Sequence, residues 1–441
     1  MFSKKFIDLL SELVSFKSIS TDIAYKKELE YTANYIVKLF EDNNFYTRVI
    51  NYENSNPVIY AEFTVDPKFQ TILFYGHYDV QPAKISDGWS SDPFKLRITE
   101  DKIYGRGVTD NKGQFLIYVY TVFQLISEGK LKYNVKFFIE GNEETGSNNI
   151  ENIILKNKDL LKADFVLFSD GELTMQHPTI DAGYRGIINI ILQLKTSSKD
   201  NHSGLYGGSI PNAITVLVKL LSKLYDLNYH VNISGISNNI LKFNIDGFYT
   251  DIADIPFDLD VLKKNTGVKD ILYKDHNFYY VTGLFTSVEI TSITGGYQGE
   301  GFRNAIPGYA EAKLNVRISP FHSVDKVLNA IKDTLYSSLP PFAELHLIVH
   351  EPVSPVNLNF SSSVVPEIKS YLEKVYEKKV FFKYCGAIVP ISGILQRVLN
   401  IDVVSIGLGN EDANMHGIDE NFDTILIKKG LEFARKFLSK S

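Results

Sequence analysis

At 441 residues the chain is long for a single hydrophobic core, which favours two domains, and its composition of 44% hydrophobic and 22% charged residues is ordinary for a folded protein. The 46 Lys and Arg against 52 Asp and Glu give a net charge of −6, which argues against nucleic acid or an anionic membrane as a partner. A single cysteine, Cys385, excludes an internal disulfide and a cysteine-rich zinc site and indicates a cytoplasmic protein, so a bound metal would need His, Asp and Glu ligands.

The first 16 residues predict an amphipathic helix. Apolar residues recur at helical spacing (Phe6, Leu9, Leu10, Leu13 and Val14) and are interrupted by charged and polar ones, which is unlike a signal-peptide core. No run reaches the roughly 18 apolar residues of a membrane span, so we expect no membrane segment.

Four short apolar runs are each followed at once by residues that bind metals. They are residues 71–79, 135–144, 163–171 and 403–417. Continuous apolar runs of this length suit the buried strands of a parallel sheet, and helical patterns at 112–129 and 148–162 lie between them. The alternation predicts an α/β fold with a mostly parallel sheet and helices on both faces. Because ligands of such sheets bind beyond the carboxyl ends of the strands, the polar residues are expected to converge there.

The pattern changes between about 182 and 351. Strands are expected at 185–195, 287–296, 310–319 and 343–351, with helices at 211–226 and 323–337. This β-α-β-β-α-β order is that of a ferredoxin-like α+β unit. We therefore predict a metal-binding domain from 1–181 and 352–441, with a second domain inserted at 182–351. The aromatic-rich segment 227–286 has no clear place in this scheme.

The residues able to bind a metal or move a proton follow the strand-like runs or begin a helix. They are His77, Asp79, Asp110, Glu143, Glu144, Asp170 and His416. Each alone is an ordinary loop or cap residue, so the prediction depends on their convergence. Carboxylates gathered in one crevice repel each other, and cations keep them ionised together. Two histidines with several carboxylates suit zinc, with manganese or cobalt as alternatives, and two metals sharing a carboxylate are a usual site for hydrolysing amides or phosphates.

Several long motifs occur in a fixed order: YGHYDVQP (75–82), GWSSDPF (88–94), GRGVTDNKG (105–113), EGNEETGS (140–147), DAGYRG (181–186), NHSGLYGGSIPN (201–212) and the late His416. Together they resemble the carnosinase-like branch of the dinuclear-zinc dipeptidase, carboxypeptidase and aminoacylase superfamily. The resemblance covers nearly the whole chain and is weakest over 227–286. It implies a zinc-peptidase-type catalytic domain with an inserted lid and dimerisation domain.

The resemblance also implies a role for each matching residue. His77 and Asp170 would hold one zinc ion, Glu144 and His416 the other, and Asp110 would bridge the two. Asp79 would orient His77. Glu143 would be the general base that takes a proton from the metal-bridging water.

The inserted domain would contribute three further residues. His202, from the partner subunit of a homodimer, would stabilise the oxyanion, while Arg317 and Asn304 would contact the carboxylate or carbonyl of the substrate. Taken alone, Arg317 could equally be a solvent-facing charge on a half-exposed strand.

The chain departs from the family pattern at three places. Asn111 follows Asp110 where a second Asp is usual, so a hydrogen bond is expected to change. The motif Gly-Gly-Ser-Ile-Pro is replaced by residues 386–390, with Ile388 in place of the serine, which bears on specificity. Asp419-Glu420 stands where Asn-Glu is usual.

Our hypothesis is a metallohydrolase in which a metal-bridging hydroxide attacks the amide carbonyl of a small carboxylate-bearing peptide, as in a dipeptidase or carboxypeptidase. The alternative is an N-acyl amino acid deacylase of the acetylornithine deacetylase or succinyl-diaminopimelate desuccinylase type, because the bond chemistry is the same. A catalytically silent binding protein is a third possibility, although such proteins typically lose the ligands or the base, which this chain retains.

Overall fold

The computed structural model describes residues 3–147, 149–236, 254–359 and 363–440. The chain forms two compact units. The first comprises Met1–Asp181, Leu358–Phe382 and Pro390–Ser441, and the second comprises Ala182–Asn357 and Lys383–Val389. No helix in the described ranges is long and apolar enough to cross a membrane.

The first unit is built on a six-stranded sheet. Its strands lie in the order β1 (Tyr46–Ile50), β2 (Val58–Phe63), β6 (Asn134–Glu140), β3 (Thr71–His77), β7 (Phe165–Phe168) and β17 (Asp402–Ser405). The neighbouring strands from β6 to β17 are parallel, whereas β1 and β2 are antiparallel. This confirms the mostly parallel sheet predicted from the four apolar runs.

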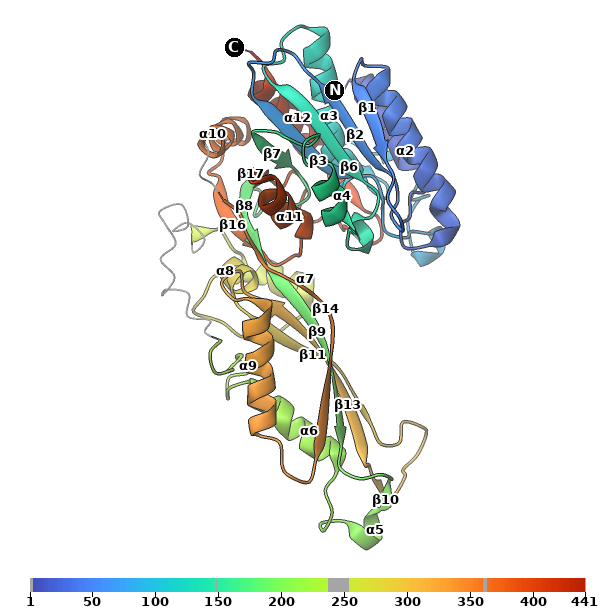
Figure 1. The fold of residues 1–441 in the computed structure, drawn as a ribbon, viewed down its shortest axis with the longest axis vertical. Coiled ribbons are helices and arrows are strands. Elements are labelled where there is room, and N and C mark those ends of the chain that lie inside the picture. The colour runs from blue at the N-terminus through green and yellow to red at the C-terminus, as the bar shows by residue number, and fades with distance from the viewer. Residues whose placement is uncertain (1–2, 148, 237–253, 360–362, 441) are drawn as a thin grey trace. The chain divides into compact units, whose positions relative to one another are not determined.

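Helices cover both faces of this sheet (Figure 1). Their bounds are α1 (Lys4–Ser15), α2 (Lys26–Glu41), α3 (Lys112–Ser127), α4 (Ile150–Lys156), α10 (Val364–Tyr376), α11 (Pro390–Leu399) and α12 (Thr424–Leu438). Helices α1, α2, α3, α10 and α12 share one apolar core with the sheet. Helices α4 and α11 lie in front of the sheet in Figure 1, on the other face. The first unit also contains a small three-stranded sheet, in the order β18 (Asn421–Asp423), β5 (Lys102–Tyr104) and β4 (Arg97–Ile98).

Helix α3 begins two residues after the predicted bridging residue, Asp110, and is buried along nearly its whole length. Lys112, in its first turn, is fully buried, and its Nζ donates hydrogen bonds to the carbonyl oxygens of Leu13 and Phe16 at the end of α1, 2.9 Å away in each case. These bonds satisfy carbonyl groups that the end of a helix leaves without partners. The start of α3 is thereby fixed against α1.

The second unit contains a four-stranded antiparallel sheet. Its order is β11 (Ser287–Gly295), β13 (Tyr309–Ile318), β9 (Gly186–Lys195) and β14 (Glu344–Val353), with helices α6 (Ala213–Leu221) and α9 (Val324–Ser337) packed on one face. Along β13 buried and less buried residues alternate, as predicted. The connectivity confirms the ferredoxin-like order.

The two ends of this unit carry short elements. β10 (Asn201–His202) pairs with β12 (Ala305–Ile306), and α5 (Ser203–Tyr206) follows β10. β8 (Thr179–Tyr184), β15 (Val356–Asn357) and β16 (Phe381–Cys385) form a separate sheet. The sequence places 352–357 in the first domain, whereas β14 continues to Val353 and β15 pairs with Gly183 and Tyr184, which keeps this segment in the second unit.

The segment 227–286, which the sequence left unassigned, belongs to the second unit. It includes α7 (Leu259–Thr266) and α8 (Phe278–Leu284), while residues 237–253 lie outside the described residues. Residues of this segment, most of them apolar or aromatic, line most of a cavity of about 760 Å³ beside β11 and Arg185.

Candidate metal centre

The predicted metal ligands lie where neighbouring parallel strands end. His77 is the last residue of β3, Glu144 and Asp170 follow β6 and β7, and His416 lies in the loop after β17. Asp110 lies two residues before the start of α3. Since the carboxyl ends of parallel strands meet at one edge of the sheet, residues far apart in the chain come together. The structure brings all five together as two groups that share Asp110.

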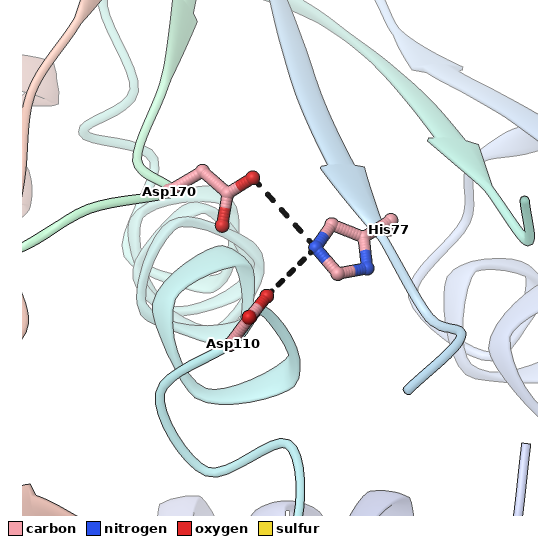
Figure 2. A group of neighbouring side chains, drawn as sticks. All are labelled: His77, Asp110 and Asp170. Carbon is pink, nitrogen blue, oxygen red and sulfur yellow. Dashed lines mark ion pairs between the residues drawn. The ribbon is translucent and has the colours of Figure 1, made fainter. Parts of the chain in front are cut away.

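The first group consists of His77, Asp110 and Asp170 (Figure 2). His77 Nε2 lies 3.1 Å from Asp110 Oδ1 and 3.7 Å from Asp170 Oδ2, and the histidine side chain is fully buried. Despite these short distances, Nε2 has no hydrogen-bond partner among the described residues. A buried ring nitrogen that faces two carboxylate oxygens without a hydrogen bond fits a metal ligand.

The second group consists of Asp110, Glu144 and His416. His416 Nε2 lies 2.9 Å from Asp110 Oδ2 and 3.1 Å from Glu144 Oε2. The histidine side chain is 57% exposed, and its backbone has a φ of +62°, a left-handed conformation that is costly for a residue other than glycine. Strain of this kind is concentrated at functional sites.

The charged side chains of the two groups shift one another's pKa values. Burial raises the pKa of Asp110, but His416 and His77 outweigh this effect and hold that pKa well below its usual range. Hydrogen bonding to Asp110 and Glu144 raises the pKa of His416 to about 10. Burial lowers the pKa of His77, but Asp170 and Asp110 raise it well above its usual value. The carboxylates of the two groups therefore favour positive charge, as those of a site for divalent cations should.

Asp79 lies behind His77 and supports the turn that carries the two glutamates. Its backbone carbonyl lies 3.1 Å from His77 Nδ1, and its Oδ1 atom lies 3.5 Å from the same nitrogen. The carboxylate accepts hydrogen bonds from the backbone N–H groups of Glu143 (3.2 Å) and Glu144 (3.1 Å). Because a carbonyl can only accept, Nδ1 of His77 carries a proton, so Nε2 is the ring nitrogen that can bind a metal.

Glu143 begins the single turn η3 (Glu143–Thr145) beside the two groups. Its carboxylate forms no hydrogen bond with the described residues, unlike that of Glu144, which accepts one from Gln81 Nε2 at 2.7 Å. Burial raises the pKa of Glu143 well above its usual value, and the nearby carboxylates of Asp170 and Asp110 add to this rise. A carboxylate with a raised pKa and no fixed partner is suited to accept and release a proton.

Other residues around the centre were not predicted from the sequence. Gln81 lies within the motif that supplies His77 and Asp79, and this position is the only feature of the sequence that indicates a place near the metal centre. Glu420 belongs to a small departure from the family pattern, and the sequence alone implies no role for it. Its buried carboxylate accepts hydrogen bonds from Arg106 Nη1 (2.8 Å) and from the backbone N–H groups of Gly107, Thr109 and Asp110 (2.9 to 3.0 Å).

The ion pair between Arg106 and Glu420 joins the loop that carries Asp110 to the loop that carries His416. Arg106 Nη2 donates to the carbonyl of Gly417, the residue after His416, at 2.9 Å. Gly107 has a φ of +86°, and a Cβ there would lie 2.9 Å from Val80, which explains the glycine that the motif requires. Asp419 accepts hydrogen bonds from Ser90 N (3.0 Å) and Ser90 Oγ (2.9 Å), so it fixes the GWSSDPF loop.

The three remaining predicted residues lie in the second unit, at opposite ends of its sheet. His202 pairs with Ala305, and the N–H of Ser203 donates to the carbonyl of Asn304 at 3.0 Å, so His202 and Asn304 lie together near the start of β13. Arg317 lies near the other end of that strand. Tyr309 and Arg317 are eight positions apart, which corresponds to roughly 26 Å along a strand.

The chain matches the model of peptidase family M20/M25/M40 over residues 73–440. It is 30% identical to the Beta-Ala-His dipeptidase of Rattus norvegicus over 396 residues, covering 87% of this chain and 80% of the relative. It is 27% identical to a Cys-Gly metallodipeptidase of Schizosaccharomyces pombe over 458 residues, covering 97% and 94%.

Two solved structures are similar over nearly their whole length. An M20 family metallo-carboxypeptidase from Sulfolobus solfataricus has a TM-score of 0.83 at 29% identity and covers 99% of each chain. Human carnosine dipeptidase 1 has a TM-score of 0.77 at 28% identity, covering 98% of this chain and 95% of that one. These relatives are peptidases, which favours the peptidase hypothesis over the deacylase hypothesis. The expected resemblance and fold are confirmed, and the chain belongs to peptidase family M20/M25/M40 as a metallopeptidase of its carnosinase-like branch.

Proposed function

We propose that this protein hydrolyses the peptide bond of a small peptide with a free carboxylate, as a dipeptidase or carboxypeptidase. The observation that carries the proposal is the pair of ligand groups that share Asp110, with the carboxylate of Glu143, which forms no hydrogen bond with the described residues, beside them. The relatives support the same class of substrate, because two are named for the dipeptides that they cleave.

The centre would hold two zinc ions, with manganese or cobalt as alternatives. His77 and Asp170 would ligate one ion, Glu144 and His416 the other, and Asp110 both. Two imidazoles with three carboxylates form a ligand set that suits these metals. When bound, such ions make water a stronger nucleophile and polarise the carbonyl that it attacks.

Glu143 would act as the general base. It would take a proton from the attacking water and deliver it to the nitrogen of the leaving amine. Its raised pKa suits the first step, since it makes the carboxylate a stronger base toward the proton of the water than an ordinary carboxylate would be. Asp79 would hold the turn that carries Glu143, through the hydrogen bonds to the backbone N–H groups.

Arg317 and Asn304 would contact the substrate and His202 the oxyanion, with a second copy of the chain contributing to each site. His202 Nδ1 accepts a hydrogen bond from the N–H of Gly204 at 3.0 Å, so its proton lies on the exposed Nε2 and is available to donate. A separation of roughly 26 Å along β13 is too long for one small peptide to contact both ends of the sheet of one copy.

The second copy would associate through the inserted domain. Strand β11 is an edge of the described four-stranded sheet, and Ile290 and Ile293 on it are 37% and 46% exposed. An exposed edge with apolar side chains favours pairing with another strand. The same proposal places the homodimer in the cytoplasm, because the sequence has one cysteine and no internal disulfide.

The proposal is tested by assaying dipeptides, C-terminally blocked dipeptides, and N-acetyl and N-succinyl amino acids with the same preparation. Turnover of unblocked dipeptides, lost after chelation and restored by zinc or cobalt, is the expected result. Turnover of the N-acyl compounds alone would contradict the proposed substrate class. Activity that survives complete removal of metal would contradict the proposed centre.

A further inference from the structure

Asn111 is fully buried between the ends of two neighbouring strands of the sheet. It directly precedes α3, and the parallel strands β3 and β7 pair beside it, with Tyr75 opposite Phe168. The residues that continue these strands are His77 and Asp170, one metal ligand on each side. A residue in this position can act on the first ligand group without binding a metal itself.

The side-chain amide of Asn111 bridges both strand ends. Its Nδ2 donates to the carbonyl oxygen of Ser169 at 2.6 Å and to Asp170 Oδ1 at 2.9 Å. Its Oδ1 lies 3.4 Å from the backbone nitrogen of His77 and accepts from that N–H. The partners fix the orientation of the amide, because the carbonyl and the carboxylate only accept while the backbone N–H only donates.

Gly76 provides the space for this amide. A Cβ at Gly76 would lie 3.1 Å from Asn111 Oδ1 and 2.8 Å from the Cβ of Phe115. The contact with Phe115 is shorter than side chains tolerate and the contact with Asn111 is tight, so a larger residue would push against α3 and against the amide. The glycine before His77 is thereby explained by packing against Asn111 and not by its backbone conformation.

We propose that Asn111 is a positioning residue for the metal bound by His77, Asp110 and Asp170, an inference that rests on the proposed function. By donating to Asp170 Oδ1, it leaves Oδ2, the oxygen that faces His77 Nε2 at 3.7 Å, to bind the ion. Asp170 then offers one oxygen in a fixed direction. A metal ligand held by a hydrogen bond in this way loses less conformational freedom when the ion binds.

The identity of the residue follows from the same contacts. The family pattern usually has aspartate at this position, and an aspartate would place an oxygen against the Ser169 carbonyl and Asp170 Oδ1. Three oxygens without a proton among them repel each other, whereas the amide supplies the hydrogen atoms. Asparagine also adds no negative charge to a crevice that already gathers Asp110, Asp170 and Glu143.

The test measures Co²⁺ affinity by calorimetry and by the visible absorption of the bound ion. A His416→Ala background isolates the group that contains Asp170. Asn111→Leu keeps the approximate volume and removes the donor, and Asn111→Ala is a second variant that cannot overpack the site. Each is expected to weaken Co²⁺ binding by about 10- to 100-fold. Thr121→Val is the matched control, since Thr121 is buried in α3, the helix that Asn111 precedes, and its Oγ1 has no hydrogen-bond partner among the described residues.

A double-mutant cycle shows whether the effect passes through Asp170. In an Asp170→Asn background, Asn111→Leu is expected to cause little further loss of Co²⁺ affinity. Equal Co²⁺ affinity with and without Asn111 in the His416→Ala background would overturn the inference and leave the metal centre standing. Absence of Co²⁺ binding in the His416→Ala parent, together with its absence in the unmodified protein, would overturn the centre itself.

Discussion

His416 Nε2 lies 2.9 Å from Asp110 Oδ2, although the two residues are 306 positions apart in the chain. The other oxygen of the same carboxylate faces His77 at 3.1 Å. Asp110 is therefore the one side chain common to both ligand groups. Removal of the histidine and removal of the carboxylate should have different consequences.

We expect His416→Ala to bind one metal ion per chain and Asp110→Ala to bind neither ion tightly, with the unmodified protein binding two. The first change removes a ligand from one group, and the second removes a ligand from both. Metal content after dialysis, measured by inductively coupled plasma mass spectrometry, checks the stoichiometry. His346→Ala, at an exposed histidine on β14, is the control that should keep both ions. Equal losses in the His416 and Asp110 variants would contradict a shared ligand.

Metal binding should release protons, and the affinity should rise with pH. The pKa of His416 is raised to about 10 and that of His77 lies well above its usual value, so both imidazoles are protonated near neutral pH before an ion binds. Binding needs the neutral form, so affinity should fall by about tenfold per pH unit for each proton released as pH is lowered. Calorimetry in buffers with different ionisation enthalpies counts the protons. Binding without proton release at about pH 7 would contradict the raised pKa values.

The Arg106 and Glu420 pair should contribute strongly to stability. Both side chains are almost completely buried, and the carboxylate also accepts three backbone hydrogen bonds. Glu420→Gln leaves the guanidinium without its counter-charge, so we expect a loss of about 3–5 kcal/mol in the free energy of unfolding. Urea denaturation measures this value. Arg397→Met, which breaks the exposed pair with Glu151, is the matched control and should cost less than about 1 kcal/mol.

The five ligands could be predicted because apolar runs identify buried parallel strands, and the ends of such strands meet. His77 and Asp170 each stand where a run becomes polar, so local sequence is enough to place them. Asn111 and Glu420 could not be assigned in the same way. Their roles depend on hydrogen bonds to Ser169 and to the backbone around Asp110, which only the folded chain brings within reach.

The second unit shows the same limit. Alternating burial along β13 was predictable, because successive side chains of a strand point to opposite faces of the sheet and apolar residues occupy the buried face. The separation of His202 from Arg317 was not, since it depends on the pairing of β10 with β12 at one end of the sheet. The predicted domain boundary near 352 differs from the end of the second unit at Asn357, because the pairing of β15 with β8 extends that unit. Such pairing cannot be recognised from the pattern of polar and apolar residues.

Mixing two inactive variants should restore activity if His202 acts across subunits. In a mixed dimer of Glu143→Gln and His202→Ala, one site has both the intact base and the intact partner histidine, while the other has neither. Random exchange of subunits should give about a quarter of the parental turnover. The readout is dipeptide hydrolysis after refolding the two variants together. A mixture no more active than the separate variants would contradict the exchange of His202 between copies.

Glu143→Gln should abolish most turnover without releasing metal. The carboxylate forms no hydrogen bond with the described residues, and it belongs to neither ligand group, so the amide should preserve the centre and remove only the base. The expected loss in kcat is about 10²- to 10⁴-fold, the usual contribution of a general base, with a smaller change in KM. Glu432→Gln, at an exposed glutamate on α12, is the matched control and should keep full activity. If Glu143→Gln instead lost metal and activity together, Glu143 would be a ligand, and the division of tasks between the two adjacent glutamates would have to be reversed.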